Sequence, residues 1–172
     1  MLDTYKQLIR QQYEASLCTL NACIVRCPDS AWDMRIGIYS FNQVVFHTLF
    51  YADFYLEAND RSIRQQRFHR DHPDFFADYE QLEDREPVGV YDRPSLQNYM
   101  EHCRQKVQPV IASESQSSLT AKADFARRDF SRAELHVYNI RHIQHHAAQL
   151  ILRLRIDAKQ DIPWFHSGWR EI

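Results

Sequence analysis

The chain has 172 residues and a net charge of −2, with 44% hydrophobic and 13% aromatic residues. This length suits a single domain spanning residues 1–172 with a core of its own, and the composition excludes a disordered chain. Because acidic and basic residues nearly balance, no nucleic-acid partner is expected. No apolar run approaches the roughly 20 residues that span a bilayer, and no secretory signal precedes the first helix. We therefore expect a cytoplasmic protein without a membrane partner.

Only three glycines and six prolines are present, which disfavours an all-β fold with many hairpins. The four cysteines include no Cys-x-x-Cys pair, which agrees with a reducing compartment. Cys23 and Cys27 would share a helix face and could bind a metal ion. The favoured interpretation is that both are small apolar residues packed in the first helix.

Helical periodicity predicts the first two long helices. Apolar residues recur at spacings of three and four from Asp3 to Arg26, and Pro28 disfavours helical geometry just beyond. The second helix is predicted from about Ser40 to Ala58, with His47 at the flank of its apolar side.

Residues 59–94 are irregular and charged, with a short helix predicted within 74–84. Such a connection is too long for a tight antiparallel turn and indicates a crossover that lets the second and third helices run parallel. Ser95 is predicted to cap the third helix, which continues through Val107 until Pro109 kinks or ends it.

The fourth helix is predicted to begin with a capping box of Ser131 and Glu134 and to reach Arg155 without Gly or Pro. The tail beyond it carries large aromatic residues, and it is expected to fold over one end of the bundle because exposing them to water would be costly. These are Trp164, Phe165 and Trp169. The predicted fold is all-α, a four-helix bundle with a long crossover between its second and third helices.

Histidines on two of these helices form a candidate metal site. His142 and His146 are four residues apart, so they lie on one face of the fourth helix, and His47 would supply a third nitrogen from the second helix. His145 points away from this pair and is expected to be a second-shell or surface residue. Neutral imidazole suits zinc or nickel, although pairs at this spacing also occur as ordinary core histidines.

No general acid or base stands out, so the catalytic residues stay unknown. Asp53 and Tyr138 are the candidates, but a surface carboxylate and a packing tyrosine are the more common roles for such residues. His69 and His72 lie in the charged crossover and are expected to be solvated.

Two segments resemble the DinB-like (DinB/YfiT) family. Residues 139–150, NIRHIQHHAAQL, resemble its last-helix signature, and residues 46–53, FHTLFYAD, resemble its second-helix block. The order of helices, the crossover and the Trp-bearing tail also match. Ala148 stands where many relatives have glycine, and the added methyl group is expected to be tolerated at this helix contact.

The resemblance implies a divalent metal ion, with zinc or nickel favoured, held by His47, His142 and His146 and completed by water. Some relatives are similar to metal-dependent hydrolases, and others transfer a low-molecular-weight thiol to an electrophile, so the expected partner is a small thiol or electrophile. The alternative is a non-catalytic stress-response bundle whose metal stabilises the fold or a homodimer. A fourth protein ligand would favour that alternative, and the sequence offers no obvious one.

Overall fold

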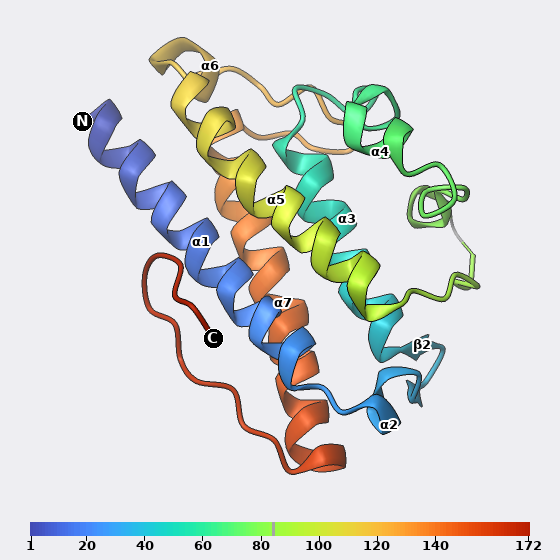
Figure 1. The fold of residues 1–172 in the computed structure, drawn as a ribbon. Helices are drawn as coiled ribbons and strands as arrows, with labels where there is room; N and C mark the ends of the chain where they lie inside the picture. Colours follow the sequence, from blue (N-terminus) through green and yellow to red (C-terminus); the bar gives the residue numbers. More distant parts are fainter. Residues whose placement is uncertain (84) are drawn as a thin grey trace.

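The computed structural model describes residues 1–83 and 85–172 and confirms the predicted all-α four-helix bundle (Figure 1). Its long helices are α1 (Leu2–Arg26), α3 (Phe41–Leu56), α5 (Arg93–Ser113) and α7 (Arg132–Ala158). The short elements are α2 (Asp29–Trp32), β1 (Arg35–Ile36), β2 (Tyr39–Ser40), η1 (Ile63–Gln65), α4 (Arg67–Asp71), η2 (Glu80–Leu82) and α6 (Gln116–Thr120). None of the described helices is both long and apolar enough to cross a membrane.

Local capping signals set the starts of α3 and α7 at the predicted residues, but the predicted capping box of Ser131 and Glu134 is only half formed. Ser40 caps α3 through a reciprocal capping box with Gln43. The Ser131 hydroxyl accepts a hydrogen bond from the Glu134 backbone N–H at the start of α7. The predicted end of α7 was too early, because the helix continues past Arg155.

The start of α5 differs from the prediction. Its cap is Asp92, whose carboxylate accepts the Ser95 backbone N–H at 2.8 Å, so Ser95 lies inside the first turn. Pro94 occupies that first turn, where a missing N–H costs nothing. Pro109 does not end the helix, which continues to Ser113.

Each long helix packs against two others, with α1 and α3 both contacting α5 and α7. Cys103 on α5 donates to the Leu49 carbonyl of α3, and farther along both helices Lys106 pairs with Glu57. This order shows that α3 and α5 run parallel, as predicted for helices joined by a long crossover (Figure 1).

A short hairpin joins α1 to α3, so the chain has a small strand pair that the all-α prediction did not include. Arg35–Ile36 and Tyr39–Ser40 pair antiparallel. Gly37 makes the turn with φ of 63°, a conformation that glycine adopts without strain.

The crossover contains less helix than predicted in its second half. Of the predicted segment 74–84, the structure describes residues 74–83, and these hold only the single turn η2, while α4 forms earlier, at Arg67–Asp71. The prolines and charges that broke the periodicity also shorten these elements, so the crossover depends on tertiary contacts for its position.

The central contact of the crossover overturns two predictions. Asp53 is fully buried rather than exposed, and His69 is only 3% exposed rather than solvated. His69 Nε2 donates to the Asp53 carboxylate at 2.9 Å, and Phe76 stacks on the imidazole with ring centroids 3.6 Å apart. Lys106 supplies the opposite charge at 2.5 Å. His72 is half-buried, with Nδ1 donating to the Phe68 carbonyl.

The C-terminal tail follows the side of α1 instead of covering an end of the bundle (Figure 1). The Gly168 backbone N–H donates to the Gln11 carbonyl at 3.0 Å. Phe165 joins the hydrophobic core and Trp169 is half-buried, but Trp164 is 79% exposed. The aromatic residues therefore do not act together, because the extended tail turns successive side chains to opposite sides.

Candidate metal centre

Helices α3 and α7 bring His47, His142 and His146 together, as the sequence predicted. The ring centroids of His142 and His146, one turn apart on α7, are separated by 4.6 Å. The His47 ring lies 5.4 Å from His142 and 4.8 Å from His146. One nitrogen of each residue lies within 4.8 Å of the other two. Ligands of a tetrahedral zinc ion lie about 3.4 Å apart, so modest side-chain rotation suffices to reach that spacing.

The packing around the cluster orients the rings. Ile143 and Ala147 are fully buried and set the face of α7 that meets the bundle, which leaves His142 and His146 at its edge. The Tyr51 ring packs against both His47 and His142, with centroids 4.9 and 5.4 Å away. The three histidines are each half-buried, so they combine partial desolvation with access to solvent.

All three imidazoles are neutral near pH 7. Burial, together with repulsion from His146, lowers the pKa of His47 to about 4. Burial likewise lowers the pKa of His142 to about 2, with added repulsion from the other histidines. The pKa of His146 also falls because of burial. A neutral imidazole keeps the lone pair that a metal ion requires.

A glutamine orients the third histidine. Gln149 Oε1 lies 2.9 Å from His146 Nδ1, and because an amide oxygen only accepts, that nitrogen carries the proton. His146 Nε2 is thereby left with a free lone pair. The Gln149 amide nitrogen donates to Nε2 of His145, which is exposed, at 3.1 Å. His145 thus lies beside the cluster, with its ring centroid 5.0 Å from that of His146 and a second link through Gln149. The position of this glutamine three residues after His146 was the available sequence signal.

One atom of the cluster lacks a partner. Nδ1 of His142 is buried and makes no hydrogen bond. A buried polar atom without a partner costs about 1–3 kcal/mol, a penalty that an ion bound to this nitrogen would remove. Three neutral nitrogen donors with one orphaned nitrogen therefore fit a divalent metal ion.

Neither candidate acid or base joins the three histidines. Burial alone would raise the pKa of Asp53, but hydrogen bonds from His102 and His69 and the charge of Lys106 hold it well below its usual value. Asp53 is committed to the crossover contact. Tyr138 lies one turn before His142, and its hydroxyl accepts from Arg128 at 3.2 Å.

In residues 1–83 and 85–172, no Cys, Asp, Glu or further His completes the cluster with a fourth ligand.

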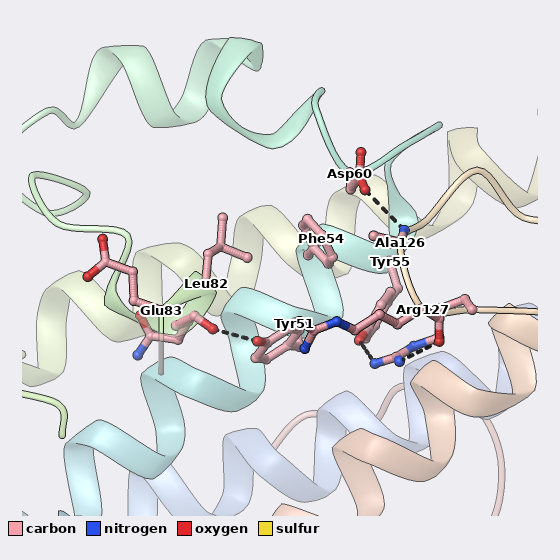
Figure 2. Close-up of a pocket in the computed structure, with 10 residues that line it drawn as sticks. Tyr51, Phe54, Tyr55, Asp60, Leu82, Glu83, Ala126 and Arg127 are labelled. Carbon is pink, nitrogen blue, oxygen red and sulfur yellow. Dashed lines mark hydrogen bonds between the residues drawn. The ribbon is translucent and has the colours of Figure 1, made fainter. Parts of the chain in front are cut away.

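A cavity of about 780 Å³ lies between α3, the crossover and the segment before α7 (Figure 2), and its Tyr51 packs on His47 and His142. Tyr51, Phe54 and Tyr55 of α3 form its aromatic wall, and the Tyr51 hydroxyl donates to the Gln81 carbonyl of the crossover. Arg128, from the segment before α7, also lines it. Sequence patterns did not single out this arginine.

The depressed histidine pKa values predict a pH dependence for the metal-free protein. Between pH 6.5 and about 4 the unfolded chain protonates His47 while the folded chain does not. The unfolded state then binds more protons, so the free energy of unfolding should fall as the pH falls through this window. Urea denaturation of chelator-treated protein at pH 7.5 and 5 measures this loss. His47→Gln should reduce the pH slope by about 1 kcal/mol per pH unit, and an unchanged slope would contradict the assignment.

The fold and the cluster define a helical bundle with three histidines between its second and fourth long helices. Residues 12–150 match the DinB superfamily, and the chain belongs to that superfamily. The fold is similar to the crystal structure of a DinB-like protein, YjoA, from Bacillus subtilis, with a TM-score of 0.60 and 14% identity. The match covers 95% of this chain and 99% of that one. A comparison with curated proteins gives no match.

Proposed function

We propose that this protein is a divalent-metal-dependent enzyme, a thiol S-transferase or a hydrolase, with His47, His142 and His146 as the metal ligands. The observation that supports this most is the convergence of three neutral imidazoles, one with an orphaned buried nitrogen. A zinc or nickel ion held there would supply a Lewis acid with an exchangeable position, which lowers the pKa of a thiol or water placed on it.

The residues around the ligands have separate tasks in this proposal. Gln149 keeps His146 in the tautomer that presents Nε2. Tyr51 covers one side of His47 and His142 and excludes water there. Next to Gln149, an apolar cavity of about 480 Å³ lined by Val44 and other side chains offers room for an apolar group.

The chain supplies no reactive sulfur of its own. All four cysteines are buried, in agreement with a packing role. Burial raises the pKa of Cys23 to about 12 and that of Cys27 to about 11, so neither is a thiolate near pH 7. A thiol reaction would therefore use a low-molecular-weight thiol, which is abundant in a reducing cytoplasm, the location we propose.

The competing proposal is a non-catalytic bundle whose metal ion stabilises the fold or a homodimer. Structural zinc sites are normally saturated by four protein ligands. The described residues provide three, which favours an open and reactive site.

Cobalt substitution tests the thiol reaction. Addition of glutathione, bacillithiol or mycothiol to the cobalt-loaded protein should produce a sulfur-to-metal charge-transfer band in the near ultraviolet. Cys18→Ser serves as a control, because it removes a buried thiol of the chain without touching the histidines. If no thiol produces the band while ester or amide substrates are hydrolysed, the hydrolase is correct. If neither the band nor hydrolysis occurs, both enzymatic proposals are wrong, and the metal ion stabilises the fold or a homodimer.

A further inference from the structure

The cavity bounded by Tyr51, Tyr55 and Arg128 has a charge arrangement that the metal site does not explain. Figure 2 shows its aromatic residues on α3, with the crossover on one side and the segment carrying Arg127 on the other. Polar and apolar side chains both face it, which is typical of a site for a small amphiphilic molecule.

Arg128 is held rigidly in this cavity by neutral groups. Its Nη2 donates to the Tyr55 hydroxyl at 2.7 Å and to the Tyr138 hydroxyl at 3.2 Å. Its Nη1 donates to the Arg127 carbonyl at 3.1 Å. The guanidinium carbon also lies 5.5 and 4.9 Å from the centres of the two tyrosine rings. Its position is therefore fixed before any ligand arrives.

The positive charge of Arg128 is not neutralised by these contacts. Nε is buried and has no hydrogen-bond partner. Outside residue 84, no carboxylate lies within 4.0 Å of this guanidinium. A half-buried guanidinium without a counter-charge is costly, since charges removed from water are normally paired.

The two carboxylates that line the cavity have other partners. Asp60 accepts the Ala126 backbone N–H at 3.0 Å, as Figure 2 shows, and also faces Arg61. Glu83 pairs with Arg85 at 2.6 Å. Neither lies within 4.0 Å of the Arg128 guanidinium, so this guanidinium is available to pair with an anion that enters the cavity.

A second arginine points to the same rim. Arg127 is exposed and has φ of 61°, an uncommon left-handed conformation for a residue other than glycine. Its backbone carbonyl binds Arg128, so the strained turn holds both arginines at the cavity.

Two side chains link the cavity to the histidines. Tyr51 forms part of its wall and packs directly on His47 and His142. Tyr138, which holds Arg128, lies on α7 one turn before His142. The cavity and the histidine cluster therefore share Tyr51 as a common neighbour.

We infer that this cavity binds a small organic carboxylate with an aromatic or apolar body, its carboxylate paired with Arg128 and its body on Tyr51 and Tyr55. Binding itself is independent of the metal ion. Its role as the site for the electrophile or the hydrolysed substrate rests on the proposed function.

Benzoate and its neutral analogue benzamide test the inference on chelator-treated, metal-free full-length protein. Titrations followed by nuclear magnetic resonance should show benzoate binding at least tenfold more tightly than benzamide. Arg128→Gln should weaken benzoate at least tenfold and leave benzamide unchanged. Arg67→Gln, which removes an 88%-exposed arginine side chain on α4, is the matched control and should have no effect.

Because Arg128 also holds two tyrosines, circular dichroism must show that Arg128→Gln is folded. If it is not, Arg127→Gln replaces it, since this exposed side chain makes no hydrogen bond of its own within the described residues. That variant should weaken benzoate about threefold, equivalent to about 0.7 kcal/mol. Equal binding of benzoate and benzamide, or benzoate affinity unchanged in the folded variant, would overturn the inference.

The two proposals fail in different ways. His142→Ala should retain benzoate binding in metal-free protein even though it removes a metal ligand. Benzoate is a ligand of the metal ion if it binds only to metal-loaded protein and its affinity is unchanged in Arg128→Gln. In that case the proposed carboxylate site is wrong, whereas the proposed metal site is retained.

Discussion

Replacing Asp53 with alanine is expected to lower the free energy of unfolding by about 3–5 kcal/mol. Within residues 1–83 and 85–172, the substitution removes the only carboxylate that His69 and Tyr99 contact, each at 2.9 Å, and one of the two that pair with Lys106. The remaining donors would be buried without acceptors, and breaking one partner of a buried ion pair is more costly than replacing the whole pair. Urea denaturation measured by circular dichroism gives the value.

The matched control is Asp71→Ala, which breaks an exposed pair with Arg67 on α4. Exposed pairs of this kind contribute about 0.5 kcal/mol or less. A loss for Asp53→Ala as small as that of the control would show that the crossover does not depend on this contact. Since the pKa of Asp53 is held well below its ordinary value, its contribution should be present at neutral pH and lost only in strong acid.

His142→Ala and His47→Ala are each expected to reduce the bound divalent metal from about one per chain to less than a tenth. Each substitution leaves two of the three converging nitrogens. His47→Ala leaves both on α7, and His142→Ala leaves one on α3 and one on α7. Elemental analysis of protein purified without chelator measures the stoichiometry, with zinc or nickel expected.

His145→Ala is the control for these variants, because His145 is exposed and packs beside His146 without being one of the three converging histidines. It should keep nearly full metal content. If the bound metal per chain is unchanged in both His142→Ala and His47→Ala, the assignment of these residues as metal ligands is wrong, and so is the proposed metal-dependent activity. Loss in His145→Ala equal to that in His142→Ala would instead make His145 a direct ligand.

The sequence predicted the parts of the site that depend on local spacing. The spacing of four residues from His142 to His146 places both rings on one helix face wherever that helix packs. His47 required more than spacing, because its approach to α7 depends on how the two helices face each other. The resemblance of residues 46–53 to a family block supplied that information, and the observed ring distances agree with it.

The starts of α3 and α7 were predictable for the same local reason. Ser40 and Ser131 cap helices whose first turns follow directly in the chain. Asp92 was missed in favour of Ser95 because both residue types cap helices, and only the position of Pro94 in the first turn separates them.

Tertiary structure alone decided which charged residues are buried. Asp53 and His69 read as surface residues, yet the crossover folds back and joins them in the core. Arg128 carries no periodic signal, and its role in the cavity arises from Tyr55 on α3 and Tyr138 on α7. Local spacing sets the face of a helix on which a side chain lies. Whether a charge is buried depends on partners distant in the chain, which only the packed bundle brings into contact.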